Sequence, residues 1–265
     1  MNMPQRAPEP RWGWKVPERH ETIGSTNAEA LLDPRVGRVV VAEHQSAGQG
    51  RRGRVWSSPP GTGMAVSAVV PPLPPEVLGW VPLVAGLAVR AALRESRWPV
   101  DVVLKWPNDV LVEAGPRPGK LAGVLAQVAD ATSAVVVGTG VNIDHDVDQL
   151  PVPTATSWRL CRGGAPLPDA AREAFLADYL GHLARLHDEL ALGRAGQVRA
   201  AYLRACSTLG HVVTVHGAAG AGTTGTAVEV AADGALVVEG PAGRSVHHAG
   251  DVEHLRPGPG PAYLP

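Results

Sequence analysis

Cysteine is scarce in this sequence, long apolar runs are missing, and each shortage excludes a class of protein. Cys161 and Cys206 are the only cysteines in 265 residues, which excludes a disulfide framework and a metal site built from cysteine ligands. The first residues are polar and proline-rich and lack the apolar core of a secretory signal. The longest apolar stretch, residues 80–93, contains Arg90 and is too short to cross a bilayer. We therefore expect a cytoplasmic protein with no membrane contact.

Net charge and lysine are also in short supply. The formal net charge is −1, so the whole chain has no general attraction for nucleic acid, and any site for a polyanion must be local. Lysine supplies three of the 24 basic residues, at positions 15, 105 and 120. The last two fall in motifs described below, although three residues are few enough for chance to remain an alternative.

Several well-known catalytic motifs are missing as well. The sequence contains no GxSxG, HExxH or CxxC. His247, His248 and His254 have no third ligand at a suitable spacing, and we interpret them as surface histidines. The chemistry must therefore come from other residues.

The hydrophobic pattern predicts an α+β protein with two domains after a short tail. Residues 1–16 are expected to be a loose tail, although Trp12 and Trp14 favour packing against the body. Residues 17–207 would form the main domain and residues 208–265 a small β-barrel of about five strands, with a hairpin turn at Asp233-Gly234. Because the strands have few helices between them, we expect a central mixed sheet flanked by helices rather than a doubly wound parallel one.

The positions of individual helices and strands are predicted from hydrophobic periodicity, capping residues and turn residues. Ser25 or Thr26 is a natural helix N-cap, and Glu29 could complete a capping box with Thr26. Helices are expected at 76–97, 169–192 and 196–205, and residues 46–63 read as a loop. Strands of the main domain are expected at 18–24, 38–43, 64–70, 100–106, 109–113, 121–128 and 134–141.

The segment GQGRRGR at 48–54 is the first candidate for chemistry. Glycines let backbone N–H groups approach an anion, and Arg51, Arg52 and Arg54 add forked donors suited to carboxylate and phosphate. No Gly-Lys-Ser/Thr follows, so this is not a Walker A loop. A solvated basic loop or a nucleic-acid patch remains an alternative.

Three further motifs follow along the chain. In KWPND, Pro107 ends a strand, so that Lys105 could face a phosphate and Asp109 could hold a magnesium ion or a ribose; an ordinary turn is the alternative. In GKLAG, Lys120 could project a charge into a pocket, or simply lie on the surface. In GTGVN, alternating glycines flatten one strand face before Asn142, whose amide suits a nucleobase edge, although a lone GxG is weak.

The order of these motifs closely resembles the biotin–protein ligase family. Ser25-Thr26-Asn27 come first, then Gln45 and the arginine loop with a following Trp56, then KWPND, KLAG, GxGxN and a small β domain. The match runs from about residue 20 to 256. The resemblance implies a class II synthetase-like catalytic domain of the lipoate and biotin ligases with an SH3-like C-terminal barrel. The family's loop commonly has Arg where this chain has Gln49, which puts the tightness of loop closure in question.

The resemblance also implies roles for single residues. Arg51 and Lys120 would be catalytic, at the acyl–phosphate junction. Biotin would be bound by Ser25, Thr26, Asn27, Gln45, Gly50, Arg51, Lys120 and Gly123. The nucleotide would be bound by Arg52, Arg54, Trp56, Lys105, Asn108, Asp109 and Asn142, with Mg²⁺ at Asp109.

The implied activity is an ATP-dependent ligase. It would activate biotin as biotinyl-5′-AMP and transfer it to a lysine of a biotin carboxyl carrier protein or carboxylase biotin domain. A lipoate–protein ligase or octanoyltransferase of the same superfamily is the enzymatic alternative. A biotin-responsive repressor is disfavoured, since about 16 residues precede the motifs, too few for a helix-turn-helix, and specific DNA binding is not expected. A non-catalytic interaction module is discouraged by the full motif set, and the oligomeric state stays open.

Overall fold

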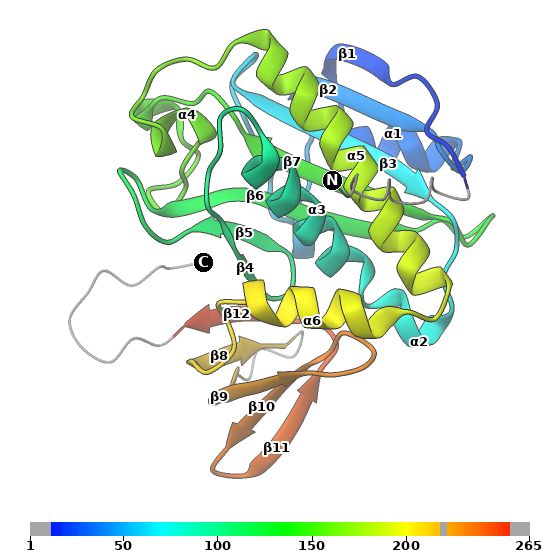
Figure 1. Cartoon of the computed structure of the whole chain (residues 1–265), viewed down its shortest axis with the longest axis vertical. Coiled ribbons are helices and arrows are strands. Elements are labelled where there is room, and N and C mark those ends of the chain that lie inside the picture. The colour runs from blue at the N-terminus through cyan, green and yellow to red at the C-terminus, as the bar shows by residue number, and fades with distance from the viewer. Residues whose placement is uncertain (1–11, 218–221, 255–265) are drawn as a thin grey trace, which may run out of the picture.

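Two β-sheets with helices packed on them make up the protein (Figure 1). The computed structural model describes residues 12–217 and 222–254. Within them, one sheet has seven strands in the order β1-β2-β3-β7-β6-β5-β4, and a second has five in the order β11-β10-β9-β8-β12. The strands of the first sheet are β1 (Glu18–Ile23), β2 (Val39–Gln45), β3 (Gly63–Val70), β4 (Val103–Lys105), β5 (Asp109–Val112), β6 (Gly119–Val128) and β7 (Val135–Asn142). Those of the second are β8 (Val212–His216), β9 (Gly222–Val230), β10 (Leu236–Gly240), β11 (Gly243–His247) and β12 (Asp251–His254).

The pairing of the first sheet confirms the mixed α+β prediction. β1 runs parallel to β2, whereas the remaining paired strands of the described sheet are antiparallel. The expected strands are all present, and the largest difference is at 100–106, where regular pairing is confined to Val103–Lys105.

Side chains alternate between the two faces of this sheet, as period-two patterns require. Val39 and Val41 point into the main core, and Val40 between them joins a smaller cluster on the other face. The main core lies under α3 (Val81–Glu95) and α5 (Asp169–Ala191), which cross one face side by side (Figure 1). Helix α1 (Thr26–Leu32) covers the smaller cluster through Ala30. The remaining helices are α2 (Pro75–Leu78), α4 (Trp158–Cys161) and α6 (Ala195–Ala205), with 3₁₀ turns η1 (Arg51–Gly53) and η2 (Val147–Gln149).

The helix expected at 76–97 is divided, and the second sheet packs against the break. Regular α-helical structure is interrupted by a turn at Gly79 and Trp80, between α2 and α3, although both residues keep right-handed helical backbone angles. A Cβ at Gly79 would collide with the carbonyl oxygen of Asp233, in the hairpin between β9 and β10. Trp80 donates its indole N–H to the Ala232 carbonyl at 2.8 Å. Pro82, near the start of α3, is a local signal for this break that the sequence interpretation overlooked, and the hairpin packs against the interruption.

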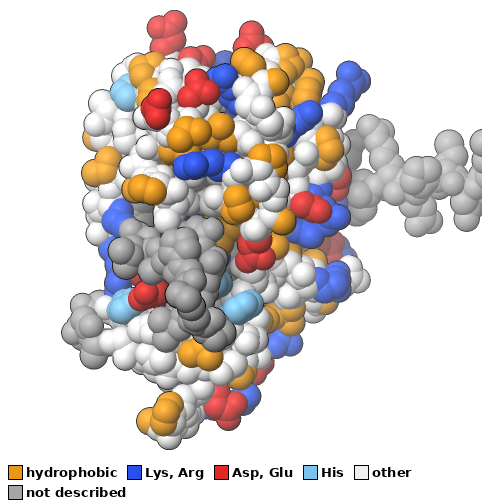
Figure 2. All heavy atoms as spheres, turned by 90° about the vertical axis from the view of Figure 1, so that its left-hand side faces the viewer, with side chains coloured by type: hydrophobic (Ala, Val, Ile, Leu, Met, Phe, Trp, Pro, Cys, Tyr) orange, Lys and Arg blue, Asp and Glu red, His pale blue; other side chains and the backbone are white. Residues whose placement is uncertain are grey.

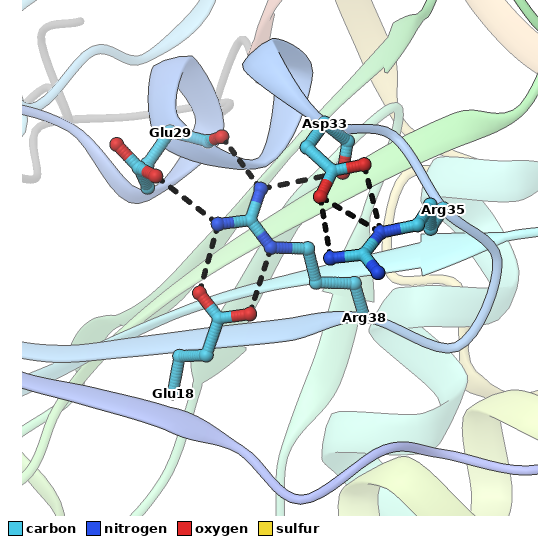
Figure 3. Close-up of polar contacts among 5 residues, drawn as sticks. All are labelled: Glu18, Glu29, Asp33, Arg35 and Arg38. Atoms are coloured by element: carbon cyan, nitrogen blue, oxygen red, sulfur yellow. Dashed lines mark hydrogen bonds and ion pairs between the residues drawn. The ribbon is translucent and has the colours of Figure 1, made fainter.

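Arg38 fixes the parallel edge of the sheet (Figure 3). Its guanidinium donates to both carboxylate oxygens of Glu18 on β1, at 2.9 and 2.8 Å, and to Glu29 on α1 at 3.0 Å. The expected capping box is wrong, since Ser25 is the N-cap and Glu29 binds Arg38 instead. The pairing holds β1, β2 and α1 together beside the residues of the Ser-Thr-Asn motif.

The C-terminal strands form an antiparallel sheet below the first one, with α6 between them (Figure 1). The hairpin predicted at Asp233-Gly234 is confirmed, with Gly234 at a φ of +89°. In the described part of this sheet β11 pairs with β10 and β12 with β8, and no pairing between β11 and β12 closes a barrel. The domain boundary near residue 208 stays a prediction.

The described part of the N-terminal tail packs against α5. Trp12 donates to Asp188 at 3.2 Å and Trp14 donates to the Leu180 carbonyl at 2.9 Å, so residues 12–16 are tied to α5 rather than loose. Residues 1–11 lie outside the described residues.

Among the helices that the structure describes, none combines the length and the apolar character needed to cross a membrane.

Candidate functional site

A cavity of about 540 Å³ lies where the arginine loop, strands β4 to β7 and the second sheet meet. It brings together almost all of the residues selected from the sequence, the first and last of which, Ser25 and Asn142, are 117 positions apart in the chain. Those lining it are Ser25, Thr26, Asn27, Gln45, Gly50, Arg51, Arg54, Trp56, Lys105, Asn108, Asp109, Lys120, Gly123 and Asn142. Arg52 is the exception among them and does not line the cavity. On the side of the molecule seen in Figure 2, acidic and basic side chains are interspersed with no large area of one sign.

The arginine loop is a tight hairpin that faces its arginines in different directions. Gln49 and Val55 form an antiparallel bridge, and the Gly50 N–H donates to the Arg54 carbonyl at 2.6 Å. Arg52 has a φ of +56°, a left-handed conformation that costs a non-glycine residue about 1 kcal/mol or more. This turn sends the Arg51 side chain into the cavity and leaves Arg52 outside.

Arg51 contacts residues that adjoin strands of both sheets. Its guanidinium donates to the Gly250 carbonyl at 3.1 Å and to Asn108 Oδ1 at 3.4 Å. The Asn108 amide donates in turn to the Val124 carbonyl at 2.8 Å, which turns its oxygen toward Arg51. Burial lowers the pKa of Arg51, and the carboxylates of Asp251 and Asp109 raise it. An arginine remains charged despite such a shift, so the cavity contains a fixed, partly desolvated cation.

Arg52 and Arg54 share one carboxylate from the second sheet. Arg52 donates to Asp251 Oδ2 at 3.2 Å and Arg54 donates to Asp251 Oδ1 at 2.5 Å. These pairs join the loop to the first residue of β12. Both arginines were expected to bind the nucleotide. The position of Arg54, which lines the cavity, favours this role, whereas the position of Arg52 outside the cavity does not.

The two lysines of the motifs lie beside one carboxylate. Lys120 Nζ is 2.6 Å from Asp109 Oδ1 and 5.6 Å from the centre of the Trp56 ring. Burial lowers the pKa of Lys105, which the nearby Asp109 carboxylate partly offsets. The arrangement concentrates positive charge in a poorly hydrated place, where an anionic ligand would neutralise it.

Two glycines explain the position of Trp56. A Cβ on Gly140 would lie 2.5 Å from the Trp56 Nε1 atom, and one on Gly123 would lie 3.1 Å from its Cζ3 atom. The indole therefore rests against β7 and close to β6, where glycines leave room for it. The flat strand face expected from GTGVN is occupied by Trp56 itself, and the expected contact of this ring with adenine stays a prediction.

In the part of the chain that the structure describes, only the nitrogen of the Asn142 side-chain amide has a hydrogen-bond partner. Its Nδ2 donates to the Thr156 carbonyl at 3.0 Å, and its buried Oδ1 has no partner within the described residues. A buried oxygen without a partner costs about 1–3 kcal/mol, so it is suited to receive a donor from a ligand. This geometry is compatible with the expected adenine contact.

Ser25, Thr26, Asn27 and Gln45 gather at another end of the cavity. Gln45 Oε1 accepts from the Thr26 backbone N–H at 2.8 Å. Thr26 and Asn27 are 3% and 7% exposed, which makes this the buried end of the cavity. Asn27 lies directly over Gly138, where a Cβ would collide with its amide oxygen.

The second sheet contributes residues that the sequence interpretation missed. Strand β12 lines the cavity with Asp251, Glu253 and His254, and β8 adds His216. His254 stacks on His211 with ring centroids 5.5 Å apart, so its interpretation as a surface histidine was wrong. No local pattern marks these positions, because what brings them to the cavity is the docking of two sheets.

A resident metal centre finds little support. No group of three or more histidine, cysteine or acidic side chains that could hold an ion occurs among residues 12–217 and 222–254. Asp109 offers one carboxylate, already paired with Lys120. Magnesium commonly binds through one or two carboxylates together with ligand phosphates, and Asp109 fits that mode better than a cage made by protein alone.

Known proteins resemble this chain over most of its length. The family model described as the biotin/lipoate A/B protein ligase family matches residues 21–144. A biotin–[acetyl-CoA-carboxylase] ligase of Mycobacterium tuberculosis is 35% identical over 255 residues, which cover 92% of this chain and 91% of that protein.

Solved structures show the same fold. The biotin protein ligase of Aquifex aeolicus in complex with biotin and ATP is 24% identical, with a TM-score of 0.71, and the match covers 92% of this chain and all of that one. The biotin protein ligase of Leishmania major in complex with biotinyl-5-AMP is 23% identical, with a TM-score of 0.58 over 91% of this chain and 98% of that one.

Proposed function

This chain belongs to the biotin protein ligase family and is a ligase enzyme, and we propose that it activates biotin as biotinyl-5′-AMP and transfers the biotinyl group to a lysine of a biotin carboxyl carrier protein or domain. The observation that carries the proposal is the cavity, in which a buried polar end and a cationic centre are joined. A ligand with a polar ring at one end and a carboxylate at the other matches this division. The solved complexes of related fold, with biotin and ATP in one and biotinyl-5-AMP in another, support the choice of ligands.

The first step joins two anions. A carboxylate oxygen of biotin attacks the α-phosphorus of ATP, and the bond to the leaving pyrophosphate breaks. The protein must cancel the charge that builds up, and Arg51 and Lys120 are the cations proposed to do so. Removing such a donor typically costs ~2.7–4 kcal/mol in the transition state, or about 10²–10³ in rate.

The ATP phosphates bring their own divalent ion. We propose that Asp109 shares a Mg²⁺ with these phosphates, and that Lys105 and Arg54 contact the phosphates directly. The ion would polarise the phosphoryl oxygens when bound. Asn142 and Trp56 are proposed to meet the adenine, and Asn108 supports Arg51 through the contact described above.

In the second step the acceptor lysine attacks the activated carboxyl carbon. The nucleophile is the neutral Nζ, which forms an amide bond as AMP leaves and loses a proton to its surroundings. The mixed anhydride hydrolyses in water, so the intermediate must stay covered until the acceptor arrives. The arginine loop, tied to β12 through Asp251, is the proposed cover.

One experiment tests the activity. The protein is incubated with biotin, ATP and Mg²⁺, pyrophosphate release is followed, and biotinyl-AMP is sought by mass spectrometry, with lipoate in a parallel reaction. We expect product with biotin and little with lipoate; the reverse preference would favour a lipoate ligase. Lys120→Ala and Arg51→Ala should lose at least 10²-fold in pyrophosphate release while their circular dichroism spectra stay unchanged. Normal release by either variant would contradict the assigned role.

A further inference from the structure

Ser67 lies behind the buried end of the cavity and does not line it. It belongs to β3, is fully buried, and its hydroxyl faces two residues that do line the cavity. Ser67 Oγ is 2.8 Å from Thr26 Oγ1 and 2.6 Å from Asn27 Oδ1. A serine hydroxyl has one proton, so it can donate to only one of these two partners.

The Asn27 amide decides which partner receives that proton. Its Nδ2 lies 3.2 Å from the Leu125 carbonyl oxygen and 2.7 Å from Gln127 Oε1. A carbonyl oxygen only accepts, so the amide nitrogen must face Leu125 and the amide oxygen must face Ser67. Because this oxygen also only accepts, the Ser67 proton is committed to Asn27.

The direction of the remaining hydrogen bonds then follows. The Thr26 hydroxyl has two acceptors within reach, Ser67 Oγ at 2.8 Å and Gln45 Oε1 at 3.1 Å. Ser67 Oγ has already given its proton to Asn27, so the 2.8 Å contact is a hydrogen bond only if the Thr26 hydroxyl donates to it, and the Thr26 oxygen keeps its lone pairs for other contacts. The Thr26 backbone N–H donates to Gln45 Oε1, which leaves the Gln45 Nε2 protons free. The buried end therefore offers an acceptor on Thr26 and a donor on Gln45.

We propose that Ser67 is a positioning residue that sets this polarity, so that the buried end complements the N–H and C=O groups of a cyclic urea. The inference rests on the proposed function, because the ureido ring of biotin is such a group. Ser67 is oriented by Asn27, acts through Thr26 and does not touch the ligand. Without the Ser67 hydroxyl, the Asn27 oxygen loses its donor and the Thr26 proton turns to its remaining acceptor, Gln45 Oε1, which redirects the lone pairs of the Thr26 oxygen.

Direct binding and kinetics test the proposal in the full chain. Ser67→Ala should weaken biotin binding about tenfold by calorimetry and raise the KM for biotin to match, while the KM for ATP and kcat change less than twofold. The thiol of Ser67→Cys is a weak donor, so the biotin affinity of this variant should lie between those of the wild type and Ser67→Ala. A merely structural role would instead lower kcat or change both KM values.

Two comparisons make the result specific. Ser157→Ala removes another fully buried hydroxyl, which donates to the His145 carbonyl outside the cavity, and should leave biotin binding unchanged. In a Thr26→Ala background, Ser67→Ala should weaken biotin binding further by less than twofold, because the two residues act as one unit. Additive losses would overturn the role of Thr26 as the link.

The outcomes separate this inference from the proposed function. A wild-type chain that binds biotin while Ser67→Ala binds it equally well overturns the inference alone. A wild-type chain that binds no biotin overturns the proposed function and the inference with it. A tenfold loss confined to biotin supports both.

Discussion

Gly140→Ala should separate activity from stability more cleanly than any charge removal. A Cβ at this position would lie 2.5 Å from Trp56 Nε1 and 2.6 Å from its Cζ2 atom. Carbon contacts are favourable near about 3.5 Å, so the indole must shift by about 1 Å. Overpacking a closed core costs about 1–3 kcal/mol, and because Trp56 borders an open cavity we expect about 1 kcal/mol here.

The effect on catalysis should be much larger than the effect on folding. A displacement of about 1 Å in a reactive site can cost about 10²-fold in rate. The Trp56 ring lies against the same strand face as the proposed nucleotide site and 5.6 Å from Lys120 Nζ. We therefore expect pyrophosphate release to fall about 10²-fold while Tm falls by only about 2–4 °C.

The assay compares initial rates of pyrophosphate release with thermal unfolding of the same preparations. Gly181→Ala on α5 is the matched control, because no atom lies within 4 Å of a Cβ there. Trp56→Phe introduced into Gly140→Ala provides a smaller ring and should recover part of the loss if crowding is the cause. Unchanged kinetics in Gly140→Ala would refute the packing argument.

Two further predictions concern charge. Asp251→Ala removes the carboxylate that binds Arg52 and Arg54, and all three side chains are partly exposed. The free energy of unfolding should therefore fall by about 1 kcal/mol at low salt, and by less at 1 M salt. Equal urea midpoints for the variant and the wild type at low salt would contradict this prediction. Burial of His145 lowers its pKa to about 4, well below the value of about 6.5 in the unfolded chain. Between these two pH values the unfolded chain binds a proton that the folded chain does not. The free energy of unfolding is therefore highest above about pH 6.5 and falls by about 3 kcal/mol as the pH drops to about 4. His145→Gln should flatten that slope in urea unfolding at pH 4.5 and 7.5, and an unchanged slope would show that the protons bind elsewhere.

Local pattern was sufficient for most of the elements and for the composition of the site. Val39, Val40 and Val41 predict a strand buried on both faces, and the long helix at Asp169–Ala191 follows from its apolar period. The order of motifs along the chain selected Arg51, Lys105, Asp109 and Lys120, and these line one cavity. Such features depend on neighbours in sequence, so the chain alone contains them.

Contacts between distant segments were beyond the reach of such patterns. A side chain is excluded at Gly79 because the Asp233 hairpin packs there, and His254 reaches the cavity because β12 docks beside the arginine loop. Neither contact can be predicted from a local pattern, since each depends on a partner more than 150 residues away in the chain.

The sequence by itself determined the family, the elements and the residues that meet in the cavity, because motif order and hydrophobic period are properties of the chain. The tertiary structure alone decided the directions of the charges and hydrogen bonds. It turned Arg52 away from the cavity toward Asp251, laid Trp56 against Gly140, and placed Ser67 behind Thr26. These choices depend on packing between the two sheets and between their strands, where geometry over a few ångströms sets which donor meets which acceptor.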